Sequence, residues 1–256
     1  MTIIIGTPYH PDGAYVFNRF LANQKQIQES YPDSELVLAT SLIEYVDQLE
    51  QQLKAFRIKG KVLHYSFSKP DYAIFRIWDI TAARNIIRLY ALSKPEAEGL
   101  LFLDADMIFD PAVANILKEK MGQYDVIFSG YRLKDDWLAM SGFGCTLLSR
   151  KILKSVNFRC YEFKNRDALC EDEVLEFDLN RKWRKVKRGI FLNIDHYKRS
   201  NEALHIRPQP IPFINRLVNQ SWIRYILVRL SILFQRNISF RTKKFIHKYI
   251  HPKIKA

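Results

Sequence analysis

The chain has 256 residues, of which 48% are hydrophobic and 13% aromatic, so it can bury a sizeable core and is not intrinsically disordered. Its net charge of +13 is unevenly distributed: residues 181–256 carry 19 Lys and Arg against Asp195 and Glu202, whereas residues 1–180 carry 21 basic and 25 acidic residues. The slightly acidic body argues against nucleic-acid binding, and any basic partner surface belongs to the C-terminal quarter.

The apolar spacing in the first 94 residues predicts alternating strands and helices. The expected strands lie at 2–7, 34–40 and 61–67, and the expected helices at 15–29, 43–56 and 80–94. Thr81 is the expected N-cap of the last of these helices. Strands that alternate with helices indicate an α/β fold with a mostly parallel sheet covered by helices.

The next strand ends in two carboxylates. Residues 100–111 read LLFLDADMIFDP, which predicts a strand buried on both faces, and a further strand is expected at 124–130. Because side chains alternate along a strand, Asp104 and Asp106 are expected to point to the same side. In parallel sheets ligands bind beyond the carboxyl ends of the strands, where these two aspartates lie.

Paired carboxylates at a strand end suit a divalent cation. Mg²⁺ and Mn²⁺ are usually held by one or two protein carboxylates together with substrate phosphates and water. The residues alone leave an alternative open, in which Asp104 caps the turn that follows and Asp106 is solvated. Asp110-Pro111 is interpreted as the turn that carries the chain away.

Five segments in this order resemble those of the GT-A glycosyltransferases, especially the family-2-like members. They are AARN at 82–85, DAD at 104–106, SGFG at 141–144 with Ser149-Arg150, CEDEVLEFDL at 170–179 and His196 in LNIDHYKR. The resemblance implies a GT-A, Rossmann-like catalytic domain over residues 1–205. It also implies a transferase that moves a sugar from a UDP- or GDP-sugar donor to an acceptor hydroxyl.

The same resemblance implies how the donor is bound. Asp106 is the expected ligand of Mn²⁺ or Mg²⁺, and Asp104 and His196 complete the metal site. Asp104 and Arg84 would also contact the donor. At the end of the first strand, the expected nucleotide contacts are Thr7, Pro8 and Tyr9.

On the acceptor side, the resemblance implies an inverting reaction in which Asp172 deprotonates the acceptor hydroxyl. Glu171 would orient the acceptor. Gly142 and Gly144 let the backbone approach a ligand closely, and Trp137 offers a flat apolar surface for a sugar ring. A retaining transferase remains the alternative, and in that case the assignment of Asp172 fails.

The C-terminal extension, residues 206–256, is expected to be helical, basic and apolar. From Ala203 to the end there are eleven Lys and Arg and no Asp or Glu. The stretch from Trp222 to Phe234 is too short and too charged for a transmembrane helix but suits an anionic membrane interface. We therefore expect contact with a membrane surface through residues 211–256 and a glycan or lipid-linked acceptor. Packing of the extension on the catalytic domain is the alternative.

Cysteine usage and the N-terminus suggest a compartment. Cys145, Cys160 and Cys170 are odd in number and lack CxxC spacing, which fits a reducing setting rather than a disulfide framework or a structural zinc site. The opening MTIIIG has no secretory signal pattern. We expect a cytoplasmic protein associated peripherally with the inner face of the membrane.

Three other classes of protein share parts of this pattern. A haloacid-dehalogenase-like phosphatase also has DxD after an apolar strand, although normally near the start of its domain. A sugar nucleotidyltransferase shares the α/β frame, but its Gly-rich basic loop is absent after the first strand. An inactive transferase-like subunit of a membrane complex is the non-enzyme alternative.

Overall fold

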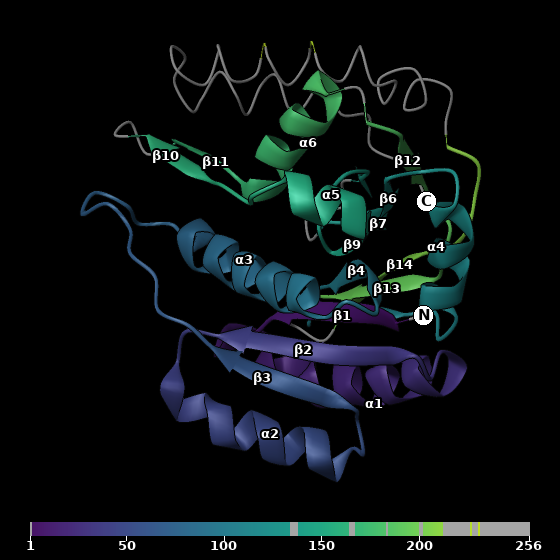
Figure 1. The fold of residues 1–256 in the computed structure, drawn as a ribbon. Coiled ribbons are helices and arrows are strands. Elements are labelled where there is room, and N and C mark those ends of the chain that lie inside the picture. The colour runs from purple at the N-terminus through teal and green to yellow at the C-terminus, as the bar shows by residue number, and fades with distance from the viewer. Residues whose placement is uncertain are drawn as a thin grey trace.

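The computed structural model describes residues 2–133, 138–163, 167–182, 184–199 and 202–211, together with Ile226 and Leu230. Its centre is a seven-stranded sheet in the order β12-β6-β9-β4-β1-β2-β3 (Figure 1). The strands are β1 (Thr2–Pro8), β2 (Ser34–Thr40), β3 (Gly60–His64), β4 (Ala97–Leu103), β6 (Val126–Ser129), β9 (Cys145–Ser149) and β12 (Val186–Gly189). Only β9 runs antiparallel to its neighbours, so the predicted α/β fold with a mostly parallel sheet is confirmed.

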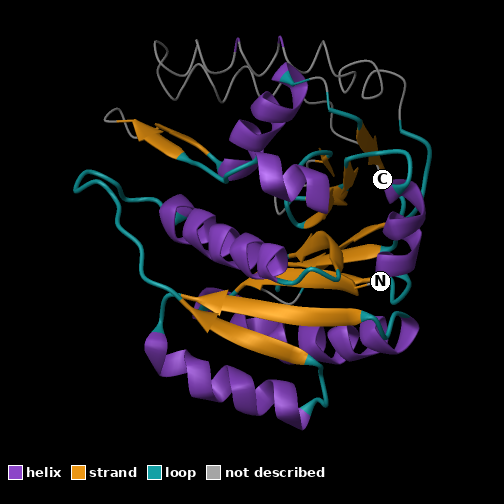
Figure 2. Ribbon diagram, viewed as in Figure 1, coloured by secondary structure: helices purple, strands orange, loops and turns teal. Residues whose placement is uncertain are grey.

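Helices cover both faces of this sheet (Figure 2). One core holds α1 (Ala14–Ser30), α2 (Val46–Ala55) and α4 (Val113–Met121), and the other holds α3 (Ile77–Ser93), α5 (Arg150–Ser155) and α6 (Glu171–Arg181). Side chains of β4 alternate between the two cores, Leu101 and Leu103 in the first and Leu100 and Phe102 in the second. All four are fully buried, as the apolar run predicted.

Smaller sheets extend the central one. A three-stranded sheet joins β5 (Met107–Phe109), β13 (Ile194–Tyr197) and β14 (Ala203–Ile206), and two hairpins pair β7 (Tyr131–Arg132) with β8 (Leu138–Ala139) and β10 (Tyr161–Phe163) with β11 (Asp167–Leu169). The remaining elements are the 3-10 turns η1 (Pro11–Gly13) and η2 (Ile43–Tyr45). Because β5 follows β4 within four residues and pairs with β13, His196 lies opposite Met107, close to the DAD segment.

Several element boundaries differ from those predicted. Helix α3 begins at Ile77, so Thr81 lies inside it and bonds the Ile77 carbonyl (2.6 Å) instead of capping the helix. The start of α3 is held by contacts from a distant hairpin, which the local sequence does not reveal. The third strand ends at His64, and the predicted helix 43–56 begins as η2. Asp110 does form the expected turn, since its carboxylate accepts from Ala112 N (3.0 Å).

The predicted C-terminal extension lies largely outside the described residues. Of residues 206–256, the structure describes 206–211, Ile226 and Leu230. Within the described part of the chain, no helix has the length and apolarity needed to cross a membrane.

Arg150 ties the end of α3 to the sheet. Its Nη1 donates to the carbonyls of Ala91 (3.2 Å), Lys94 (2.7 Å) and Ala97 (3.1 Å), and its Nη2 donates to that of Leu92 (2.8 Å). The last carbonyls of a helix have no partner within the helix, so one guanidinium satisfies several of them at once.

Replacement of this side chain should therefore destabilise the fold. We expect Arg150→Ala to lower the free energy of unfolding by about 2–3 kcal/mol, because several carbonyls lose a charged donor. The matched control is Lys151→Ala, whose largely exposed side chain pairs with Asp125 and should matter by less than about 0.5 kcal/mol. Urea denaturation measures both, and equal stabilities would contradict this role for Arg150.

Candidate active site

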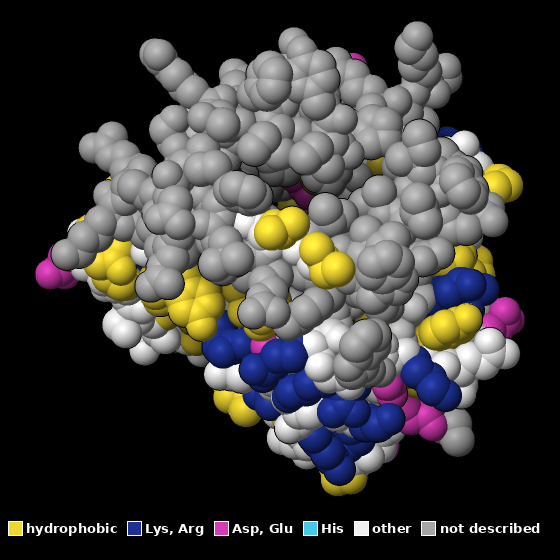
Figure 3. Space-filling view, turned by 90° about the horizontal axis from the view of Figure 1, so that it is seen from above, with side chains coloured by type: hydrophobic (Ala, Val, Ile, Leu, Met, Phe, Trp, Pro, Cys, Tyr) yellow, Lys and Arg dark blue, Asp and Glu magenta, His cyan; other side chains and the backbone are white. Residues whose placement is uncertain are grey.

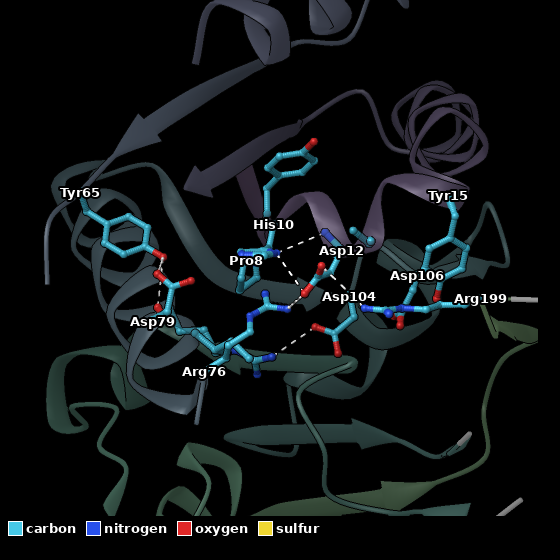
Figure 4. Close-up of a pocket in the computed structure, with 15 residues that line it drawn as sticks. Pro8, His10, Asp12, Tyr15, Tyr65, Arg76, Asp79, Asp104, Asp106 and Arg199 are labelled. Carbon is cyan, nitrogen blue, oxygen red and sulfur yellow. Dashed lines mark hydrogen bonds and ion pairs between the residues drawn. The ribbon is translucent and has the colours of Figure 1, made fainter. Parts of the chain in front are cut away.

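A cavity of about 260 Å³ opens at the carboxyl ends of β1 and β4 (Figure 4). Two carboxylates and one guanidinium of the predicted site line it, together with the end of β1. The lining residues are Pro8, Tyr9, His10, Asp12, Gly13, Tyr15, Tyr65, Arg76, Asp79, Ile80, Arg84, Asp104, Ala105, Asp106 and Arg199. The cavity therefore lies where a parallel sheet is expected to bind its ligand.

The two aspartates reach the cavity by a different geometry from the one predicted. Strand β4 ends at Leu103, and Asp104 to Asp106 form a turn closed by the bond from Met107 N to the Asp104 carbonyl (3.2 Å). Strand alternation does not apply within a turn. Asp104 is directed toward Arg84 and Asp106 toward His196, so the two carboxylates have different partners.

His196 lies against Asp106. Its Nε2 is 3.3 Å from Asp106 Oδ2, and its Nδ1 is 2.6 Å from the carbonyl oxygen of Arg132. A carbonyl can only accept a hydrogen bond, so Nδ1 carries a proton and Nε2 is the nitrogen that faces the carboxylate. Two acceptors at this distance are stable together only with a proton or a cation between them. A proton on Nε2 makes the contact an ion pair, and a neutral ring leaves Nε2 and the carboxylate oxygen available to a cation.

Arg84 links the carboxylate at the end of β4 to the start of α6. Its Nη2 lies 3.2 Å from Asp104 Oδ1 and its Nε 3.3 Å from Glu171 Oε1, and the side chain is 6% exposed. The guanidinium also lies over the Phe143 ring, 4.4 Å from its centroid. Burial raises the pKa of Asp104, and the charge of Arg84 opposes that rise.

Asp172 belongs to the same group of charges. Its Oδ1 accepts from Glu173 N (2.8 Å) at the N-terminal turn of α6. Burial, followed by the charges of Glu171 and Glu173, raises the pKa of Asp172 to about 8. The described lining residues of the cavity do not include Asp172. Its carboxylate can accept a proton near neutral pH.

Tyr131 joins these groups, and no motif in the sequence predicts its position. Its buried hydroxyl accepts from Gly144 N (3.3 Å), and its ring meets His196 edge to face at 6.0 Å. Burial raises the pKa of Tyr131 well above its usual value, and the charges of Asp104 and Asp172 add to the rise. Tyr131 therefore contacts His196 and lies within electrostatic range of Asp104 and Asp172.

The glycines of SGFG make room for this tyrosine. A Cβ at Gly142 would collide with the Tyr131 hydroxyl, and one at Gly144 would lie 2.7 Å from Tyr131 Cζ and from Met107 Cε. The Gly144 carbonyl also accepts from Asp104 N (3.2 Å). The glycines therefore pack against Tyr131 and the turn.

The predicted nucleotide contacts divide into two groups. Pro8 and Tyr9 line the cavity, although the Tyr9 ring is 5% exposed and packs edge to face on Phe17 (4.8 Å). Thr7 is fully buried, and its hydroxyl donates to the Leu103 carbonyl (2.7 Å), so it joins β1 to β4. Trp137, the predicted sugar-stacking residue, lies outside the described residues.

Two arginines at the cavity were not predicted. Arg76 Nη1 lies 2.8 Å from Asp12 Oδ2, and Arg199 Nη2 lies 3.7 Å from Asp12 Oδ1, so one carboxylate stands between two guanidinium groups (Figure 4). Arg199 follows His196 by three residues in HYKR, which was an available clue. Arg76 and Asp12 come from distant loops and carry no local motif.

The donor groups fit an open metal site. In the described ranges, no group of three or more His, Cys, Asp or Glu side chains is arranged to hold a metal ion by itself. Asp106 and His196 nevertheless offer an oxygen and a nitrogen at one point, with Asp104 two residues away. Such a partial set suits Mn²⁺ or Mg²⁺ that takes its other ligands from phosphates and water.

Sequence comparisons identify no relative of this chain. No family model matches it, and no curated protein sequence matches it.

Solved structures with a similar arrangement do exist. A197 from STIV is 12% identical over 83% of this chain and 98% of its own, with a TM-score of 0.46. Glucosyl-3-phosphoglycerate synthase from Mycobacterium tuberculosis, in complex with Mg²⁺ and uridine diphosphate, is 15% identical over 90% of this chain and 78% of its own, with a TM-score of 0.47. S. aureus TarS 1–349 with UDP-GlcNAc is 14% identical, with a TM-score of 0.44 over 62% of this chain and 49% of its own.

The last two structures were solved with a uridine nucleotide, uridine diphosphate or UDP-GlcNAc. This chain spans about half of the TarS fragment, 49%. Identities of 12% to 15% and TM-scores of 0.44 to 0.47 do not assign it an activity, which depends on the chemistry of its own site.

The contact between Tyr131 and Gly142 can be tested by a double-mutant cycle. We expect Gly142→Ala to destabilise the fold by about 1–3 kcal/mol, because the added methyl group overlaps the Tyr131 hydroxyl. Tyr131→Phe removes that hydroxyl, so the double variant should lose less stability than the sum of the single losses. Urea denaturation of the four proteins measures the coupling, and strict additivity would show that the two residues do not interact.

Asp172 should make stability depend on pH. The pKa of Asp172 is raised from 3.8 to about 8, so the folded state favours the protonated acid. The contribution of this acid to the free energy of unfolding is therefore complete below about pH 4 and is lost as the pH rises to about 8. Asp172→Asn does not titrate. The melting temperature of Asp172→Asn minus that of the wild type should therefore increase as the pH is raised from about 4 to about 8. A difference that stays constant over this range would contradict the raised pKa.

Proposed function

We propose that this protein is a metal-dependent glycosyltransferase that moves a sugar from a nucleoside-diphosphate donor to an acceptor hydroxyl. The observation that carries the proposal is the pairing of His196 Nε2 with Asp106 Oδ2 at 3.3 Å beside a cavity lined by guanidinium groups. A phosphate-bearing ligand suits such a cavity, because it can complete a metal's coordination and also accept hydrogen bonds from arginine.

Asp106 and His196 would hold Mn²⁺ or Mg²⁺, with Asp104 oriented beside them by Arg84. A divalent cation, when bound, neutralises part of the charge that develops on the leaving diphosphate. Arg84 contributes further to this charge balance, since its Nη1 makes no hydrogen bond to the described residues and its side chain lines the cavity. Arg76 and Arg199 lie at the same cavity as two more donors for phosphate oxygens.

Asp172 is proposed as the base that takes the proton of the acceptor hydroxyl, which makes the reaction inverting. Its pKa of about 8 lies close to the pH at which a base must accept and release a proton. Glu171, held by Arg84, would orient the acceptor. Measurement of the product's anomeric configuration by NMR distinguishes this proposal from a retaining reaction.

We propose a glycan or lipid-linked acceptor and a peripheral location at the cytoplasmic face of the inner membrane. Residues 211–256 would contact the membrane surface. The sequence of this segment supports the proposed membrane contact, because it combines aromatic and aliphatic residues with ten Lys and Arg and no acidic residue.

Two substitutions separate donor binding from transfer. Asp106→Ala should abolish the thermal stabilisation that Mn²⁺ and a nucleoside diphosphate give together, because it removes the proposed metal ligand. Asp172→Asn should keep that stabilisation and lose transfer by at least about 100-fold, the usual contribution of a general base. The measurements are a thermal shift with a panel of nucleoside diphosphates and a transfer assay read by mass spectrometry.

Asp195→Asn provides a matched control for both variants. Asp195 lies on β13 beside His196 but pairs with His205 (2.8 Å) and Arg207 (2.9 Å) away from the cavity. It should therefore bind and transfer as the wild type does. Absence of stabilisation with every diphosphate would reject the proposed donor class, and normal transfer by Asp172→Asn would reject that residue as the base.

A further inference from the structure

Two of the three cysteines lie at the base of hairpin β10–β11. The pair of residues at the base of the two strands is Tyr161 with Leu169. The same register continued by one residue places Cys160 opposite Cys170, where the hairpin meets the start of α6. No CxxC spacing marks this pair in the sequence. The hairpin is what brings the two residues together.

The backbone at this position allows a disulfide. Cys170 has extended backbone angles, φ −72° and ψ 160°, so it continues the line of β11. Its N–H donates to Glu173 Oε2 (3.1 Å) instead of across the hairpin, which makes its position opposite Cys160 a non-hydrogen-bonded one. Such pairs have Cα atoms about 4.5 Å apart, and disulfides span roughly 4.4–6.8 Å between Cα atoms.

The two thiols lie close enough to affect each other. Burial raises the pKa of Cys170, and the neighbouring carboxylates and the thiol of Cys160 raise it further. Both cysteines carry free thiols in the structure. Cys160 is 5% exposed, whereas Cys170 is partly exposed. An oxidant in solution therefore reaches Cys170 more easily than Cys160.

The hairpin connects the two helices that carry the charged groups of the site. Glu162 accepts from Ile74 N (2.7 Å) and Trp78 Nε1 (3.2 Å), which holds the hairpin to the start of α3. On the other strand, Cys170 is the N-cap residue of α6 and directly precedes Glu171. In Figure 1 the hairpin projects from the edge of the molecule beside α3 and α6, and hydrophobic side chains gather along that edge in Figure 3. A covalent bond at the base of the hairpin would therefore hold the starts of both helices together.

We propose that Cys160 and Cys170 form a disulfide when the protein meets a peroxide, and that this bond locks the start of α6 to the hairpin. The Cys170 thiolate attacks one peroxide oxygen, the O–O bond breaks and water leaves, so Cys170 becomes a sulfenic acid. The Cys160 thiolate then attacks Cys170 Sγ, the S–O bond breaks and a second water leaves. Two electrons pass from the thiols to the peroxide, and the two thiol protons end in the two water molecules.

The burial of the pair sets the conditions under which the bond forms. A raised pKa keeps the Cys170 thiol protonated, and a protonated thiol reacts slowly. The pair therefore stays reduced in a reducing setting and is oxidised only when the peroxide persists. The bond would then fix the position of Glu171 and Asp172, which follow Cys170 directly. The inference does not depend on the proposed transfer reaction.

Peptide mapping of the full-length chain tests the proposal. The folded protein is treated with hydrogen peroxide, its remaining thiols are alkylated in denaturant, and it is digested with trypsin without a reductant. Cys160 and Cys170 fall in separate tryptic peptides, 160–164 and 167–181, so the bond joins two peptides that otherwise separate. We expect the joined peptides by mass spectrometry, with Cys145, which is fully buried in β9, recovered as an alkylated thiol.

The melting temperature gives a second readout. The oxidised protein should melt about 5 °C higher than the reduced one, because the bond restricts the unfolded chain, and dithiothreitol should reverse the increase. Cys170→Ala should lose this response to peroxide. The matched control is Cys145→Ala, which keeps both thiols of the pair and should respond as the wild type does.

Several results would overturn the proposal. One is the recovery of Cys160 and Cys170 as alkylated thiols after peroxide treatment. Another is a bond from either residue to Cys145, or a covalent dimer on a non-reducing gel, because the two thiols would then not be partners within one chain. A bridged protein that melts at the same temperature as the reduced one would show that the bond does not lock α6.

Discussion

The buried guanidinium of Arg84 is the charge on which the arrangement of the site depends. It is 6% exposed, lies over the Phe143 ring and stands between Asp104 and Glu171. A buried charge is tolerated only when it is paired, and loss of one partner of such a pair costs about 3–5 kcal/mol. The end of β4 and the start of α6 are therefore held at a fixed distance from α3. The Asp104 turn and the acidic start of α6 meet at the same place for this reason.

A second constraint brings the histidine to the aspartates. The turn at Asp104 to Asp106 leads into β5, which pairs with β13, so backbone register alone sets His196 opposite Met107. The Arg132 carbonyl then fixes the tautomer of the ring, and Tyr131 packs against its edge. Because these contacts come from hydrogen-bonded strands, Nε2 already faces Asp106 in the structure without a ligand, which is the preorganisation that the proposed metal-dependent transfer would need.

Much of the fold followed from the apolar pattern. The buried run before Asp104 is a central strand, and the alternation of strands and helices gives the mostly parallel sheet. Local rules failed where distant contacts override them: Thr81 was expected to cap α3, but the helix starts four residues earlier, where Glu162 of a far hairpin binds the preceding backbone. The two aspartates were expected to share a strand face; they lie in a turn instead and contact different partners, and both line the cavity as expected.

The sequence by itself determined the chemistry available to this protein: paired aspartates after an apolar strand, a late histidine, an acidic helix start and a basic tail. It could do so because residue types and short spacings are local properties of the chain. Only the tertiary structure decided which groups meet. Tyr131, Asp12 and Arg76 reach the site through contacts between distant segments that no local spacing encodes. Thr7 is fully buried and bonds the Leu103 carbonyl, so it does not line the cavity. The pKa of Asp172 likewise depends on burial, which arises only when the helix packs on the sheet.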